Sequence, residues 1–87
     1  MARHLSLDGF TRPKEEDDSL NQLALSIFNN PQGEAFLEYL KSITLNAVAG
    51  GGVSDGELRH LEGQRYIVAL IVKRMAKAEK DLQEQVK

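Results

Sequence analysis

The chain has 87 residues, no cysteine and a formal net charge of −2. This length allows one domain, and the absence of cysteine excludes disulfides and thiolate metal sites. A charge so close to zero favours no class of partner. We expect a soluble protein, because no apolar run approaches the roughly 20 residues of a membrane span and the start lacks the apolar core of a secretion signal. A core of this size is marginal, which favours association with a partner.

Residues 1–17 are predicted to form an N-terminal arm, followed by a single helical domain over residues 18–87. Gly9 and Pro13 interrupt the arm, and its apolar residues lack helical spacing. They are too few to fold alone, so they dock either on a neighbouring molecule or on the chain's own core: Leu5, Leu7 and Phe10. The four carboxylates of residues 15–18 mark a helix start, where the helix dipole favours negative charge, rather than a calcium loop.

Two short helices are expected next, over residues 18–29 and 34–47. Apolar residues recur at helical spacing in both segments, and Pro31 separates them, although the second helix could also begin at Pro31 itself. Three consecutive glycines at 50–52 then predict a flexible break. The apolar stripes, combined with that of the following segment, predict a core made of Leu23, Ile27, Phe36, Leu40, Ile43, Leu61, Val68 and Val72.

A long C-terminal helix is predicted over residues 55–84. Ser54 and Glu57 match a capping box at its start. The run 66–72 is rich enough in β-branched residues to form a buried strand, but the following residues 73–85 are strong helix formers without a breaker. We therefore predict an all-α protein with two short helices, one long C-terminal helix, an N-terminal arm and no sheet.

Part of the long helix is apolar on more than one side. Tyr66 and Leu70 project away from the predicted core stripe, and Ile67 and Ile71 lie between the two faces. Apolar side chains among charged neighbours are typical of an interface, although the arm could instead fold back and cover them. The candidate interface residues are Leu5, Leu7, Phe10, Tyr66, Ile67, Leu70 and Ile71.

We expect no enzyme activity, no catalytic or metal-binding residues and no cofactor. His4 and His60 lack partners at catalytic or metal-binding spacing, and the glycine triplet is not a nucleotide-binding loop. One basic cluster on the long helix is a weak candidate for phosphate contacts, because Glu79 and Asp81 interrupt it and no aromatic residue accompanies it. Its members are Lys73, Arg74, Lys77 and Lys80.

The segments 30–40, NPQGEAFLEYL, and 61–68, LEGQRYIV, resemble a family of short tailed-bacteriophage proteins. The hallmarks of this family are a Pro-x-Gly helix start and, after a variable loop, a Glu-Gly-x-Arg helix; the resemblance covers residues 27–75. Its members are typically encoded near portal and capsid genes, which implies a virion or assembly accessory protein. The residues themselves suggest structural roles: Gly63 predicts a closely crossing helix, and Arg65 should pair with Glu62 or reach loop carbonyls.

The expected function is therefore a phage structural or assembly accessory protein. It would act by protein–protein contacts within the virion, as a homo-oligomer, and be located in the virion or the host cytoplasm, with no membrane partner. One alternative is a packaging or regulatory protein that contacts DNA through the basic end of the long helix. Another is a small inhibitor of a host enzyme.

Overall fold

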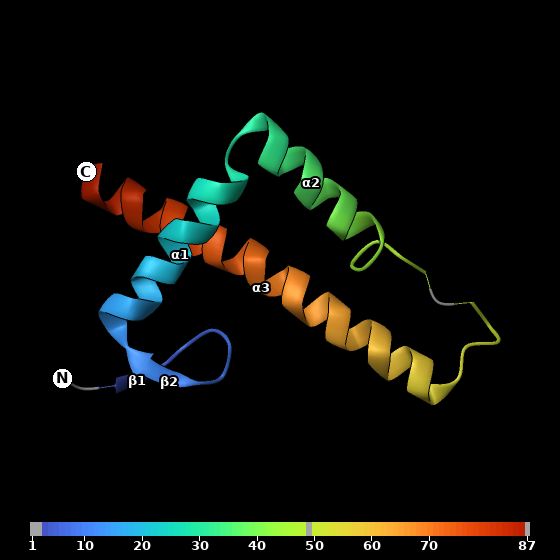
Figure 1. The fold of residues 1–87 in the computed structure, drawn as a ribbon. Helices are drawn as coiled ribbons and strands as arrows, with labels where there is room; N and C mark the ends of the chain where they lie inside the picture. Colours follow the sequence, from blue (N-terminus) through green and yellow to red (C-terminus); the bar gives the residue numbers. More distant parts are fainter. Residues whose placement is uncertain (1–2, 49, 87) are drawn as a thin grey trace.

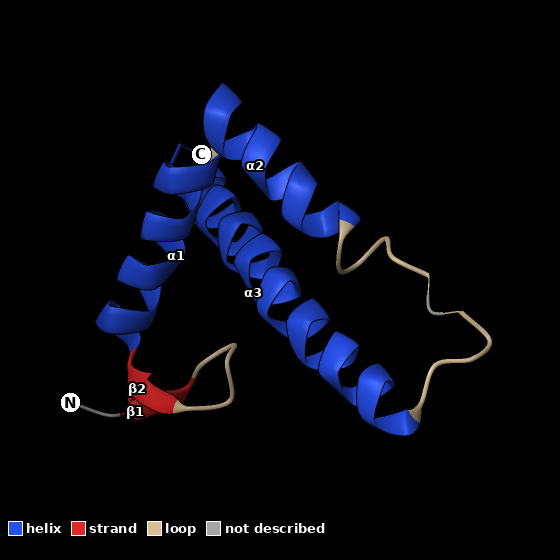
Figure 2. Ribbon diagram, turned by 45° about the vertical axis from the view of Figure 1, so that its right-hand side comes forward, coloured by secondary structure: helices blue, strands red, loops and turns tan. Residues whose placement is uncertain are grey.

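The computed structural model describes residues 3–48 and 50–86, with side chains as far as Gln85. It contains a hairpin of two short strands, β1 (Arg3–Leu5) and β2 (Thr11–Pro13), followed by three helices: α1 (Lys14–Phe28), α2 (Pro31–Ser42) and α3 (Asp55–Val86). Figure 1 shows α3 as the long axis of the molecule. The first helix crosses the C-terminal half of α3, and α2 runs alongside its N-terminal half (Figures 1 and 2). The two short helices thus cover different parts of α3.

The three predicted helices are confirmed with shifted ends. The first begins at Lys14 rather than residue 18, and the second begins at Pro31 and ends at Ser42 rather than residue 47. The run 66–72 lies inside α3, so its assignment as helix was right. The side chain of Ser54 accepts a hydrogen bond from the backbone N–H of Glu57 (3.2 Å), which provides half of the predicted capping box.

The prediction of no sheet was wrong. Strands β1 and β2 pair in antiparallel register, with Arg3 opposite Pro13 and Leu5 opposite Thr11, and Figure 2 shows the hairpin at the foot of α1. Gly9 makes the connecting turn possible, because its φ of 88° lies in a region that only glycine enters without steric cost. Strands of three residues are too short to show a recognisable alternation of polar and apolar side chains.

The connection between α1 and α2 is a tight elbow built by Asn30. Its side-chain oxygen accepts from the backbone N–H of Gly33 at 2.8 Å, and its side-chain nitrogen donates to the carbonyl of Ile27 at 2.9 Å. Pro31 follows as the first residue of α2, where its fixed φ suits the helix and its missing N–H costs nothing. The chain therefore reverses within two residues, and Gly33 packs directly against the end of α1.

Alanine substitutions at two helical glycines should have opposite effects. A Cβ at Gly33 would collide with the Ile27 carbonyl and lie 2.7 Å from the Phe28 Cα, which are backbone atoms, whereas a Cβ at Gly63 meets nothing within 4 Å. Gly33→Ala should therefore destabilise by about 1–3 kcal/mol, and Gly63→Ala should stabilise by about 1 kcal/mol. Urea unfolding of the two variants measures both effects, and a stable Gly33→Ala protein would contradict the elbow geometry.

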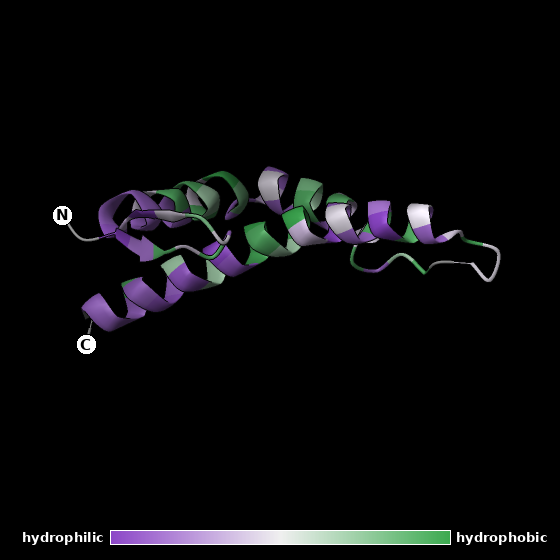
Figure 3. Cartoon of the chain, turned by 90° about the horizontal axis from the view of Figure 1, so that it is seen from below, coloured by the Kyte–Doolittle hydropathy of each residue, from purple (hydrophilic) through white to green (hydrophobic). Residues whose placement is uncertain are grey.

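The buried hydrophobic residues of the described chain are Leu25, Leu37, Val68 and Ala78. The predicted core was right for Val68, whereas Leu40, Leu61 and Val72 are half-buried. It was wrong for four residues that are about half exposed: Leu23, Ile27, Phe36 and Ile43. Both short helices are rotated so that one flank of the apolar stripe faces α3 and the rest faces outward. In Figure 3 the hydrophobic parts of α1 and α2 lie in a layer on one side of α3.

Arg65 fixes the segment that leaves α2. Its Nε donates to the Thr44 carbonyl at 2.9 Å, and Nη2 donates to the Ala47 carbonyl at 2.5 Å. Nη1 also pairs with Glu62 Oε1 at 2.6 Å. Both predicted contacts of Arg65 are therefore confirmed. By contrast, no other part of the described chain crosses close to Gly63, so that prediction was wrong within one molecule.

Candidate functional site

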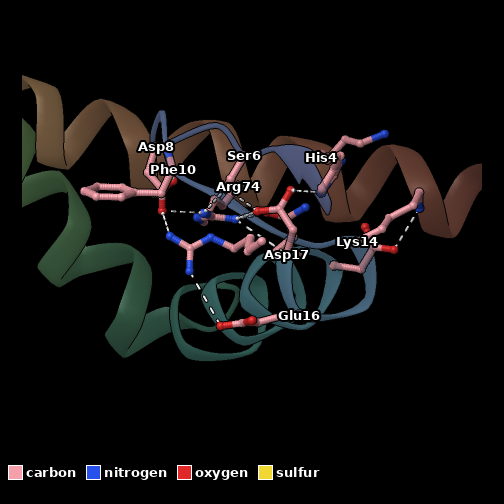
Figure 4. Close-up of polar contacts among 12 residues, drawn as sticks. His4, Ser6, Asp8, Phe10, Lys14, Glu16, Asp17 and Arg74 are labelled. Carbon is pink, nitrogen blue, oxygen red and sulfur yellow. Dashed lines mark hydrogen bonds and ion pairs between the residues drawn. The ribbon is translucent and has the colours of Figure 1, made fainter. Parts of the chain in front are cut away.

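A buried polar cluster joins the hairpin, α1 and α3 around Arg74 (Figure 4). Arg74 Nη1 donates to Asp17 Oδ1 at 2.9 Å and to Asn21 Oδ1 at 2.8 Å. Nη2 donates to Ser6 Oγ at 3.0 Å and to Asp8 Oδ2 at 3.3 Å. The Ser6 hydroxyl in turn donates to Asp17 Oδ1 at 2.5 Å. One arginine thus connects residues that lie more than fifty positions away in the sequence.

Further ion pairs at the edge of the cluster hold the hairpin against α1. Arg12 of β2 pairs with Asp8 in the turn at 2.5 Å and with Glu16 of α1 at 3.6 Å. His4 of β1 places Nε2 3.4 Å from Asp17 Oδ2. The arm therefore packs on its own chain through polar side chains, whereas the predicted packing of Leu5, Leu7 and Phe10 on the core is not seen, because all three are exposed. The charged groups are directed at one another, which suits a structural role.

Neighbouring groups keep the acidic members of the cluster ionised. Burial by itself raises the pKa of Asp17, but hydrogen bonds from Ser6 and Arg74, with the charges of Arg74 and His4, bring it below its ordinary value of 3.8. The pKa of Asp8 is also lowered, chiefly by a hydrogen bond from the Phe10 backbone N–H. The buried guanidinium of Arg74 is therefore compensated by negative charge.

Stability should decrease in acid as a result. The folded-state pKa of Asp17 is depressed, so its stabilising contribution is complete above the ordinary value and is lost as the pH falls through the lowered one. We expect the free energy of unfolding to decline below about pH 4. Asp17→Asn should remove part of this acid dependence, and Glu15→Gln, a change of an exposed carboxylate, should leave it intact. Urea unfolding at several pH values measures the effect; an unchanged profile in Asp17→Asn would contradict it.

Of the four candidate phosphate-contacting residues, the three lysines lie on the surface of α3 and Arg74 does not. Arg74 is buried and faces α1, so it is not available to a phosphate in this structure. Lys77 pairs with Asp81 of the next turn at 3.1 Å. Lys73 and Lys80 are exposed on α3. Sequence reasoning missed the role of Arg74 because its partners, Asp17 and Asn21, are polar residues on a helix whose apolar stripe suggested a different inner face.

The candidate interface residues are mostly at the surface. Leu5, Leu7 and Phe10 are exposed on the hairpin, and Figure 4 shows the Phe10 ring pointing away from the arginine cluster. On α3, Tyr66 and Ile67 are 49% and 56% exposed, whereas Leu70 and Ile71 are half-buried. The arm does not bury Tyr66 and Ile67. These exposed side chains of α3, together with those of the hairpin, are available to another molecule.

A second apolar surface was not predicted as an interface. It consists of two stripes with the same spacing, and we call it the α1–α2 face: Leu20, Leu23 and Ile27 on α1, Phe36 and Tyr39 on α2, and Ile43 directly after the end of α2. All except the half-buried Leu20 are exposed. The rings of Phe36 and Tyr39 lie against each other, with centroids 5.6 Å apart. The sequence showed these stripes clearly, but their periodicity could not distinguish a core from a surface that meets another molecule.

Two further findings concern the described residues, 3–48 and 50–86. They contain no group of three histidine or acidic residues placed to hold a metal ion. None of the helices in this part of the chain is long and apolar enough to cross a membrane.

Comparison with known proteins identifies the class. A family model of phage proteins matches most of the chain, so this is a phage protein. The matching model is described as the Bbp19-like phage protein, it covers residues 25–87, and the chain belongs to that family. The predicted resemblance to a phage family is thus confirmed. No curated protein and no solved structure matches the chain.

The family match begins at Leu25, so it divides the arginine cluster. Arg74 lies inside the matched region, whereas Ser6, Asp8, Asp17 and Asn21 all precede it. Gly33 of the elbow and Arg65, which binds the carbonyls after α2, also lie inside the matched region. The hairpin is therefore outside the matched region, and Arg74 connects it to α3, in addition to the ion pairs that hold it against α1.

Proposed function

We propose that this protein is an accessory component of the phage particle or of its assembly, and that it acts through contacts with other virion proteins without a catalytic step. The observation that carries the proposal is the exposure of Tyr66 and Ile67 in the middle of α3. Membership of a phage protein family supports it. A location in the virion or in the host cytoplasm during assembly is part of the same proposal.

The surroundings of Tyr66 suit a specific protein partner. Arg59, Glu62 and Lys73 lie one or two helical turns away on the same side of α3, and all three are exposed. An aromatic anchor with charged residues at its edge is the usual composition of a specific interface, in which the anchor supplies affinity and the charges select the partner. A complementary surface would therefore offer an apolar pocket with both acidic and basic groups around it.

The proposal is tested by incorporation of the protein into particles. In phage carrying Tyr66→Ser with Ile67→Lys, purified particles should lack the protein or assemble in reduced number. Both residues are about half exposed, so the variant should keep its helicity by circular dichroism. The control is His60→Ser with Gln64→Lys, at exposed polar positions of the same helix. Particles that contain the first variant at the wild-type level would contradict the proposal.

A further inference from the structure

We propose that two copies of this chain associate through the α1–α2 face. This inference goes beyond the proposed function and does not depend on it, because it concerns a different surface and a different partner. The face contains five residues that are each about half exposed: Leu23, Ile27, Phe36, Tyr39 and Ile43. The buried hydrophobic residues of the described chain, by comparison, include only one from each of these two helices, Leu25 and Leu37.

The six side chains of the α1–α2 face carry no charge. Within residues 20–43 the charged residues are Glu34, Glu38 and Lys41. Glu34 stands two positions before Phe36, and residues two apart lie on opposite sides of a helix. Glu38 and Lys41 pair with each other at 3.2 Å. The charges nearest the face therefore neutralise each other, whereas Arg59 and Lys73 flank Tyr66 on α3.

The two stripes form one surface because the helices touch at the elbow. Gly33 is packed against the Ile27 carbonyl and the Phe28 Cα. Phe36 lies one turn after Gly33, and Ile27 ends the stripe of α1, so the stripes meet at this point.

The exposed apolar area reaches the lower limit of what a specific dimer requires. At the observed exposure, each aromatic ring contributes about 100 Å² and each aliphatic side chain about half as much, or roughly 700 Å² for two copies. Apolar atoms make up about 60% of a typical interface. The complete contact would then bury about 1,100–1,200 Å², near the lower end of the range for specific complexes.

The face is complementary to itself, which is why we choose a second copy as its partner. Both stripes have the spacing i, i+3, i+7, so they are equally long. One consists of aliphatic residues and the other contains two aromatic rings. In a two-fold arrangement, α1 of each copy would pack against α2 of the other, so that large side chains meet smaller ones. Leu23 and Tyr39 are the middle residues of their stripes and would face each other whichever way the helices run.

Sedimentation equilibrium and exchange between variants test this arrangement. The wild-type protein should dimerise at micromolar concentration, and Leu23→Lys or Tyr39→Glu should each weaken self-association by about a hundredfold or more, since a charge would be buried without a partner. Mixing the two variants should produce a heterodimer, because the introduced lysine of one copy would face the introduced glutamate of the other. Tyr66→Ser with Ile67→Lys is the control and should remain dimeric.

A second test uses cysteines, which the natural chain lacks. Leu23→Cys and Tyr39→Cys are mild changes at exposed positions, and circular dichroism can confirm that they fold. Under oxidation, a mixture of the two should form the mixed disulfide in preference to either symmetric one. Three results would each overturn the proposal. The first is a wild-type protein that is monomeric at about 100 µM, far above the micromolar dissociation constant expected. The others are charged variants that remain dimeric and an absence of the mixed disulfide. None of these results bears on incorporation into particles, which tests the proposed function separately.

Discussion

Replacing Arg74 with methionine is expected to lower the free energy of unfolding by about 3–5 kcal/mol, the usual cost of removing one partner from a buried ion pair. The side chain of Arg74 is 8% exposed, and so is that of Asp17, its nearest acidic partner. Methionine would fill much of the space, but the Asp17 carboxylate and the Asn21 oxygen would lose their shared donor. In a domain of this size such a loss approaches the entire stability.

The hairpin should respond more strongly than the helices. Among the described residues, Arg74 is the only residue of α3 that makes polar contacts with Ser6 and Asp8. Hydrogen exchange should therefore show early loss of protection in residues 3–13, while urea unfolding reports the global effect. Arg59→Met, at an exposed position of the same helix, is the control and should change stability by less than about 1 kcal/mol.

A double change separates a charge effect from a packing effect. If the cost arises from an uncompensated carboxylate, Asp17→Asn combined with Arg74→Met should recover part of the stability that Arg74→Met loses alone. If the two costs simply add, or if Arg74→Met unfolds at the same urea concentration as the parent, the cluster is not the element that holds the hairpin.

The sequence was sufficient to predict the three helices and several local contacts, although the helix ends differ from the prediction. Pro31 indicated the boundary between α1 and α2 because proline cannot continue a helix. The run 73–85 indicated a helix because its helix propensity, summed over many residues, is high. Arg65 could be connected to Glu62 and to loop carbonyls because these partners lie on the same helix or in the loop beside it. Such inferences depend on short-range geometry.

The side of each helix that faces inward could not be predicted. An apolar stripe shows that a surface avoids water, but not whether it meets its own chain or another one. In α1 the stripe containing Leu23 and Ile27 remains outside, while Asp17 and Asn21 face α3, where Arg74 satisfies them. An inner face made of polar residues such as Asp17 and Asn21 can be predicted only when their buried charged partner, Arg74, is known. The three-residue strands gave even less signal.

Leu37→Ala should destabilise the protein by about 2–5 kcal/mol, whereas Phe36→Ala, its neighbour, should cost less than about 1 kcal/mol in the monomer. Leu37 is 5% exposed and belongs to the small set of buried hydrophobic residues, so truncation leaves a cavity; Phe36 is 58% exposed and its ring leaves little space behind. From the stripe alone the opposite order would be expected. Because dimerisation would add to the apparent stability of any variant that still dimerises, the comparison requires urea unfolding at several concentrations, extrapolated to the dilute limit. In the dilute limit, the free energy of unfolding of Phe36→Ala should be within about 1 kcal/mol of the parent's. At high protein concentration it should be lower than the parent's by a larger amount if the α1–α2 face is the dimer contact. Equal losses at both positions in the dilute limit would mean that α2 is rotated differently from the structure described.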